Sequence, residues 1–232
     1  MRRRYLNSGK ERIDLSKSYF AIEALEDGVE VKFNNYYEYC IDDGFWIKAD
    51  VTTLTSINAG QTMYFRAILM PDPSRGIGSF DIVNKCNLSG NIMSLLFGDD
   101  FEDKTSLRDY IFAFRYLFMN NDSIVDASQL ILPATTLADY CYEYMFYGCT
   151  LLEAAPALPA EILRACCYLS IFYGCDNLKY IKMLATDISA YCCLKDWVYG
   201  VASSGTFVKN ANMNDLPRGK SGIPYGWEVI DA

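Results

Sequence analysis

The sequence contains no histidine among its 232 residues. Without imidazole the chain cannot build a Ser-His-Asp or Cys-His catalytic centre, a histidine general base or a histidine-ligated metal site. The Gly-x-x-x-x-Gly-Lys-Ser/Thr phosphate-binding pattern, the dinucleotide-binding fingerprint and the zinc-binding Cys-x-x-Cys pair are absent too. We therefore expect no enzyme activity, no cofactor and no metal.

Long apolar runs and an excess of basic residues are also missing. No stretch approaches 18 apolar residues, so we expect no insertion into a membrane. The formal net charge is −8, which leaves no basic face to replace phosphate counterions, and nucleic acid is not an expected partner.

The N-terminal arm, residues 1–18, differs from this acidic background. It holds six basic and two acidic residues (6 − 2 = +4), which leaves about −12 for the rest of the chain. The arm is either a solvated terminus or an anchor that docks on an acidic neighbour in a larger particle through Arg2, Arg3 and Arg4. No apolar stretch follows its basic start, so we expect no secretory signal and synthesis in the cytosol.

A repeat dominates the second half of the chain. Met-Phe-Tyr-Gly-Cys at 145–149 returns as Ile-Phe-Tyr-Gly-Cys at 171–175, 26 residues later, and Leu-Pro-Ala at 132–134 returns at 158–160. Weaker copies lie on either side. A fixed period of this length indicates stacked units, each of which buries an apolar face on the next.

Each unit predicts one helix and one short extended run. Residues 136–147 contain no proline or glycine, and the apolar side chains of Leu137, Cys141 and Met145 recur every four residues. Gly148 then stands where a left-handed residue ends a helix. One helix and one extended segment per 26 residues is the plan of a leucine-rich repeat.

The pattern Phe-x-Gly-Cys-x-x-Leu followed by Leu-Pro-Ala resembles the BspA-like leucine-rich repeats of Bacteroidetes surface proteins, most clearly over residues 130–182. The tail of the chain is similar to the C-terminal end of such arrays. The resemblance implies a role in adhesion or in recognition of a host or partner. The repeat here is longer than is usual in that family.

The first third of the chain predicts a different structure. Short apolar strands alternate with glycine turns at 26–28, 42–44 and 58–60, a pattern typical of an antiparallel β-sandwich or barrel. The predicted fold class is α+β: a small N-terminal antiparallel β-sandwich, then a short α/β leucine-rich-repeat solenoid with a C-terminal cap. The predicted divisions are the basic arm (1–18), the β-sandwich-like domain (19–90), the solenoid (91–200) and the cap (201–232).

Nine cysteines exclude complete internal pairing, because the number is odd. Five of them recur at repeat positions: Cys141, Cys167, Cys193, Cys149 and Cys175. We expect packed free thiols, with a ladder of disulfides between equivalent positions and a zinc site as the alternatives.

Tyrosine provides the candidate binding residues. Tyr147, Tyr173 and Tyr199 recur at one repeat position, and Tyr142 and Tyr168 recur at another. Stacked rings with hydroxyl groups bind sugars or protein loops at a low cost in entropy. The alternative is that these rings shield the edge of the core between units.

Two functions follow from these observations. The first is a structural and recognition protein of a phage that infects gut Bacteroidetes (a tail-fibre, baseplate or head-decoration component), assembled in the host cytoplasm and located in the virion. Its partners would be other virion proteins or a host-surface protein or glycan. The alternative is a BspA-like adhesin of the bacterial cell surface. The chain is also a candidate homo-oligomer.

Overall fold

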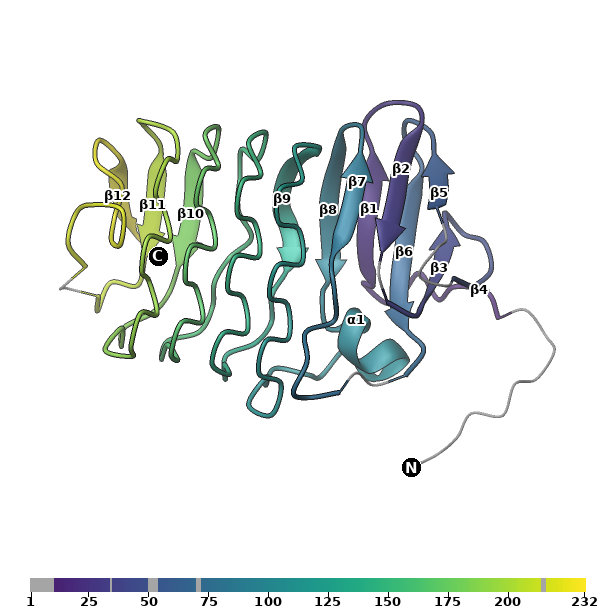
Figure 1. Ribbon diagram of the computed structural model, residues 1–232, viewed down its shortest axis with the longest axis horizontal. Coiled ribbons are helices and arrows are strands. Elements are labelled where there is room, and N and C mark those ends of the chain that lie inside the picture. Colours follow the sequence, from purple (N-terminus) through teal and green to yellow (C-terminus); the bar gives the residue numbers. More distant parts are fainter. Residues whose placement is uncertain (1–10, 34, 50–53, 70–71, 214–215) are drawn as a thin grey trace.

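The computed structural model describes residues 11–33, 35–49, 54–69, 72–213 and 216–232. The proposed anchor residues Arg2, Arg3 and Arg4 lie outside the described residues. Two packed sheets form the N-terminal end of the molecule, and parallel layers of chain continue from them to the C-terminus (Figure 1).

Among the described residues, eight strands build the N-terminal end, and six of them flank the three predicted glycine turns. They are β1 (Phe20–Ala24), β2 (Val29–Phe33), β3 (Tyr37–Ile41), β4 (Ile47–Lys48), β5 (Leu54–Ile57), β6 (Thr62–Ala67), β7 (Phe80–Val83) and β8 (Cys86–Asn91). One sheet has the order β4-β3-β6-β1-β8 and continues into β9 (Ile124–Ile131), and the other has the order β5-β2-β7.

Phenylalanine rings join the two sheets. Phe20 on β1 lies 5.4 Å from Phe80 on β7, and Phe65 on β6 lies 5.5 Å from Phe33 on β2, centroid to centroid. All four side chains are buried. The alternation of β2, in which Val29, Val31 and Phe33 point inward, is what a half-buried strand requires, because successive side chains leave opposite faces.

The pairing changes from antiparallel to parallel at β8, which pairs antiparallel with β1 and parallel with β9. A short helix, α1 (Ser94–Phe97), and a 3-10 turn, η1 (Gly98–Asp100), follow β8. The parallel ladder then runs through bridges at residues 126, 154 and 180 into the third sheet. That sheet consists of β10 (Tyr180–Met183), β11 (Thr206–Lys209) and β12 (Glu228–Asp231).

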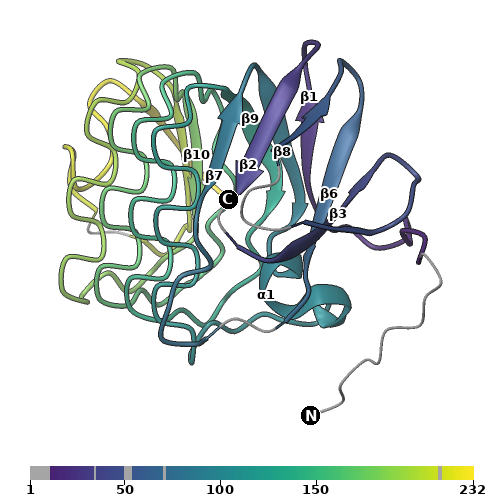
Figure 2. The ribbon, with the colours of Figure 1, turned by 45° about the vertical axis from the view of Figure 1, so that its right-hand side comes forward.

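The opposite side of each layer is a run of β-turns. We call each layer a rung and number it by its run: rung 1 at 110–121, rung 2 at 138–149, rung 3 at 164–175 and rung 4 at 190–201. Alternate amides donate within the rung and to the next rung, as Met145 N does to Tyr142 O at 3.2 Å and Tyr144 N does to Leu169 O at 3.0 Å. The runs lie side by side in both ribbon views (Figures 1 and 2).

The predicted helix at 136–147 is therefore wrong. Tyr140 (φ 59°) and Tyr144 (φ 54°) are left-handed, and a right-handed helix cannot contain such residues. Gly148 (φ 71°) is left-handed, as the sequence predicted, but it lies within a run of turns. The described chain is nearly all β, in three sheets, with one α-helix of four residues. This overturns the predicted α+β class and its α/β leucine-rich-repeat solenoid.

The error has a physical cause. Left-handed residues recur every four positions in rung 2, at 140, 144 and 148, and the buried side chains of Leu137, Cys141 and Met145 have the same spacing. A helix with 3.6 residues per turn places the same three positions on one face. Spacing alone cannot separate the two structures over so short a segment.

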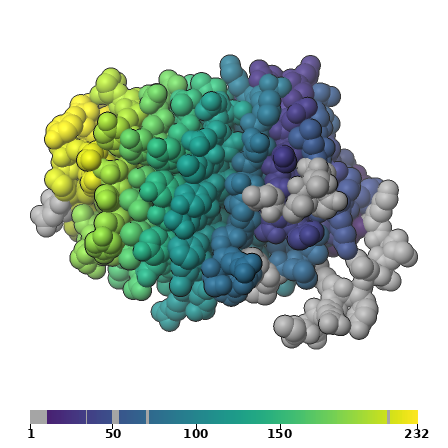
Figure 3. Space-filling view, in the orientation of Figure 1, coloured from purple at the N-terminus to yellow at the C-terminus, as the bar shows by residue number. Residues whose placement is uncertain are grey.

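One hydrophobic core runs through the described residues. Phe118, Phe146 and Phe172 stack from rung to rung with centroids 5.3 and 5.8 Å apart, and Phe118 lies 5.8 Å from Phe20 in the N-terminal sheets. The rungs also pack closely against those sheets on the face shown in Figure 3. At the other end, the indole N–H of Trp227 donates to Ala202 O at 2.7 Å and secures the last residues to rung 4.

All nine cysteines are free thiols, and eight of them are buried. The thiol of Cys149 donates to Phe118 O at 3.1 Å, and that of Cys175 donates to Phe146 O at 3.0 Å. The repeated cysteine at this position thus links rung 2 to a carbonyl of rung 1 and rung 3 to a carbonyl of rung 2.

Candidate binding surface

The five tyrosines proposed from the sequence separate into two groups. Tyr142 and Tyr168 are 1% and 0% exposed, so their rings cannot reach a partner at the surface. They stack on each other at 5.9 Å, and each lies two positions after a left-handed residue, Tyr140 or Cys166. Their hydroxyls have no hydrogen-bond partner, and burial raises the pKa of both well above the usual value.

Tyr147, Tyr173 and Tyr199 form an ordered row at the surface, which we call the tyrosine row. The first two rings lie 4.8 Å apart and 9° from parallel, and the second and third lie 4.7 Å apart and 19° from parallel. Tyr147 and Tyr173 are half-buried, and Tyr199 is 47% exposed.

Glycine sets the spacing of the tyrosine row. Each ring precedes a glycine with positive φ, at 148, 174 or 200, and these glycines lie one above another. A Cβ on Gly200 would lie 3.5 Å from the Cα of Gly174. The left-handed backbone therefore costs little at these positions, and the three rings keep the same register.

Further aromatic residues extend the surface toward rung 1. Tyr144 meets Tyr147 edge to face at 5.6 Å and stacks on Tyr116 at 5.4 Å. The guanidinium of Arg115 lies 4.5 Å from the Tyr116 ring centroid. We call Tyr116, Tyr144 and the tyrosine row together the aromatic strip. Tyr116 and Tyr144 are 28 positions apart, which is the offset between rungs 1 and 2, but neither was among the tyrosines predicted from the sequence.

The aromatic strip ends in a groove of about 710 Å³, which we call the end groove. Its walls carry two exposed rings, Tyr199 and Tyr225, the latter 74% exposed. The ammonium of Lys220 lies 5.8 Å from the Tyr199 ring centroid and 2.8 Å from a carboxylate oxygen of Asp196. The hydrogen bond to Asp196 raises the pKa of Lys220 and favours its charged form.

Three glycines also line the end groove: Gly200, Gly219 and Gly226. A Cβ on Gly226 would lie 2.6 Å from Ser203 O, so this position excludes any larger side chain. The absence of side chains leaves backbone groups accessible beside the two rings. Tyr225 and Lys220 come from outside the regular repeat, and no sequence pattern placed them next to Tyr199.

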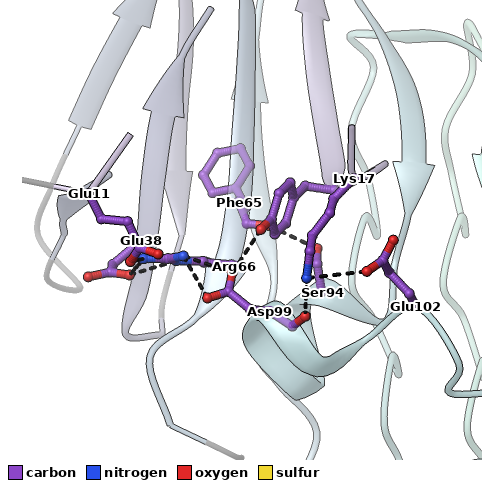
Figure 4. Close-up of polar contacts among 9 residues, drawn as sticks. Glu11, Lys17, Glu38, Phe65, Arg66, Ser94, Asp99 and Glu102 are labelled. Atoms are coloured by element: carbon purple, nitrogen blue, oxygen red, sulfur yellow. Dashed lines mark hydrogen bonds and ion pairs between the residues drawn. The ribbon is translucent and has the colours of Figure 1, made fainter. Parts of the chain in front are cut away.

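A polar cluster lies elsewhere, around Arg66 of β6 (Figure 4). Its guanidinium is buried and contacts carboxylates of Glu11 and Asp99 at 2.7 Å and of Glu38 at 2.8 Å. The hydroxyl of Tyr19 donates to Asp99 at 2.8 Å.

Burial lowers the pKa of Arg66, but the hydrogen bonds that its guanidinium donates to Glu11 and Asp99 outweigh this effect, and the net pKa shift is upward. The cluster joins the N-terminal segment to β3, β6 and η1. Its geometry is that of a structural ion-pair network, because the one buried cation is surrounded by the three carboxylates.

The described residues give little support for a metal site or for a membrane-spanning helix. They contain no group of three or more Cys, Asp or Glu side chains arranged to hold a metal ion. In the same part of the chain, no helix has the length and apolar character needed to cross a membrane.

Comparison with protein families, with curated proteins and with solved structures gives no match. The resemblance to BspA-like repeats therefore stays a prediction from the repeated motif. The surface itself, an aromatic strip that ends in a groove with two exposed rings, carries the functional argument.

Proposed function

We propose that this protein is a non-enzymatic recognition protein that binds a neutral glycan in the end groove and along the adjoining tyrosine row. The observation that carries the proposal is the stack of Tyr147, Tyr173 and Tyr199, which ends at a groove where a second ring, Tyr225, is exposed. Rings of this kind offer a large rigid contact area and a hydroxyl group at a small entropic cost.

Because the rings of the row stack on one another, the row and the end groove offer different parts of the tyrosine rings to a ligand. Within the row, each ring face is covered by its neighbour, so edges remain for contact. At the end groove, Tyr199 and Tyr225 are 47% and 74% exposed and offer area on which the C–H groups of a sugar ring can pack. Backbone groups beside the glycines supply hydrogen bonds to sugar hydroxyls.

Charge supports a neutral ligand. The chain carries a net charge of −8, which disfavours an acidic polysaccharide. Lys220, the cation in the end groove, is already paired with Asp196. A protein loop is the other class of ligand that such a surface accepts, and the binding experiment separates the two.

The setting we propose is a phage particle assembled in the host cytoplasm, with a bacterial cell-surface adhesin as the alternative. Nine free thiols favour a chain that is made and folded in a reducing compartment, where disulfides do not persist. Mass spectrometry of purified particles and the neighbouring genes test this setting: capsid and tail genes support the particle, and a surface-export locus supports the adhesin.

A glycan array tests the ligand class with three variants. Tyr199→Ala and Tyr225→Ala remove the rings of the end groove and should each weaken binding about tenfold, the worth of one aromatic contact. Tyr191→Ala is the matched control, because Tyr191 is 77% exposed and lies outside the strip and the groove. Glycan binding that is equal in all three variants, or no binding to any neutral glycan, would overturn the proposal.

A further inference from the structure

The first left-handed position of each turn run forms a column across the rungs: Phe112, Tyr140, Cys166 and Cys192, with φ between 52° and 66°. The rings of Phe112 and Tyr140 lie 5.2 Å apart, with their planes tilted by 35°. In rungs 3 and 4 thiols replace the rings, so two cysteines that are 26 residues apart in the sequence occupy adjacent places on neighbouring rungs.

The two cysteines lie on neighbouring rungs that are hydrogen-bonded to each other. Cys166 N donates to Tyr191 O at 2.9 Å, and Cys166 Sγ lies 3.7 Å from the same oxygen, which belongs to the residue before Cys192. Hydrogen-bonded neighbouring strands lie about 4.8 Å apart, which is within the Cα separation of roughly 4.4–6.8 Å that a disulfide spans.

This pair is also the one that a reagent can reach. Cys192 is partly exposed, whereas the other eight cysteines are buried. Cys149 and Cys175 are equivalent residues of neighbouring rungs as well, but both are buried and their thiols donate to carbonyls. Access therefore distinguishes the Cys166–Cys192 pair from the other cysteine columns.

We propose that Cys166 and Cys192 are a redox modification site, at which a low-molecular-weight disulfide such as oxidised glutathione converts the two thiols into a reversible disulfide between rungs 3 and 4. The thiolate of Cys192 attacks one sulfur of the small disulfide, and one small thiol leaves. The thiolate of Cys166 then attacks Cys192 Sγ, and the second small thiol leaves. The protein loses two protons and two electrons, and the small disulfide gains both.

The bond ties together the two rungs that carry Tyr173 and Tyr199. These rungs otherwise depend on hydrogen bonds and ring stacking, so the disulfide secures the last interval of the tyrosine row. It is open in a reducing compartment and closed in an oxidising one. The inference rests on the cysteine column alone and does not need a glycan ligand.

Thiol counting and peptide mapping test the site in the full-length chain. The reduced protein is incubated with oxidised glutathione, quenched in acid and digested without reductant. We expect two of the nine thiols to disappear, the chain to lose about 2 Da with the two hydrogen atoms, a cross-link between the peptides of Cys166 and Cys192, and a rise in Tm of a few degrees.

Two serine variants resolve the order of the steps. Cys166→Ser should stop at a mixed disulfide with glutathione on Cys192, and Cys192→Ser should lose no thiol. In the parent chain, a stable glutathione adduct on Cys192, a cross-link between other cysteines, or nine unreacted thiols would each overturn the proposal. The parent map decides the question even if a variant fails to fold.

Discussion

The ring of Phe146 lies on the ring of Phe172, with centroids 5.8 Å apart and planes 25° from parallel. The two residues are 26 positions apart, so this contact fixes the register between rungs 2 and 3. The same register stacks Tyr147 on Tyr173 at the surface. One alignment of rungs 2 and 3 therefore produces both the core packing and the candidate binding surface.

Substitutions at the left-handed residues of the turn runs should change the free energy of unfolding. Gly174 has φ 71°, and a Cβ there would lie an ordinary 3.8 Å from its nearest neighbour, the Cα of Gly148, so Gly174→Ala should cost about 1–2 kcal/mol through the backbone alone. Ser170 has φ 49°, so Ser170→Gly should raise stability by about 1 kcal/mol. Urea unfolding of both variants measures the effects, and shifts of the same sign would contradict this account of the turns.

The buried hydroxyl of Tyr168 has no hydrogen-bond partner, so its removal should relieve a desolvation cost. Tyr168→Phe should leave the free energy of unfolding unchanged or raise it by about 1 kcal/mol. Tyr37→Phe is the control, because the buried Tyr37 hydroxyl donates to Ile77 O at 3.2 Å and its loss should cost about 1 kcal/mol. Thermal unfolding of the pair tests the assignment, and a larger loss in Tyr168→Phe would refute it.

Arg66 should be the most sensitive charged residue of the N-terminal sheets. Arg66→Met removes the buried guanidinium that contacts the carboxylates of Glu38 and Asp99, and we expect a loss of about 3–5 kcal/mol. Arg12 pairs with Asp43 at an exposed site, so Arg12→Met should cost no more than about 1 kcal/mol. Equal losses in denaturant unfolding would show that the buried network is not a structural hub.

Glu143 should give a measurable dependence of stability on pH. Burial raises its pKa above the ordinary 4.5, although Arg115 acts in the opposite direction. Because the folded state then holds the proton more tightly than the unfolded state, Glu143 favours folding below pH 4.5, and this contribution is lost as pH rises through its folded pKa.

The Glu143→Gln variant isolates this effect. The Tm of the parent minus that of Glu143→Gln should fall as pH rises from about 4.5 toward neutrality, since only the parent carries the titrating group. A difference that grows with pH would mean that the ion pair with Arg115 outweighs burial.

Much of the local structure could be predicted from the sequence. Alternating apolar residues with glycine turns located strands such as β2 and β6, because those signals act within a few residues. The 26-residue period predicted that Tyr147, Tyr173 and Tyr199 share one environment, and they do. The same period grouped Tyr142 with Tyr168, but it carried no information on whether that environment is the surface or the core.

The sequence by itself determined the length of the repeat, the register that the repeat imposes and the absence of imidazole chemistry. Tertiary structure alone decided that 138–149 is a run of turns, that Tyr142 points inward, and that Tyr225 lies beside Tyr199. The reason is that amides such as Tyr144 N bond to carbonyls of the next rung. The sign of φ at these residues therefore depends on partners about 26 positions away, which no local pattern encodes.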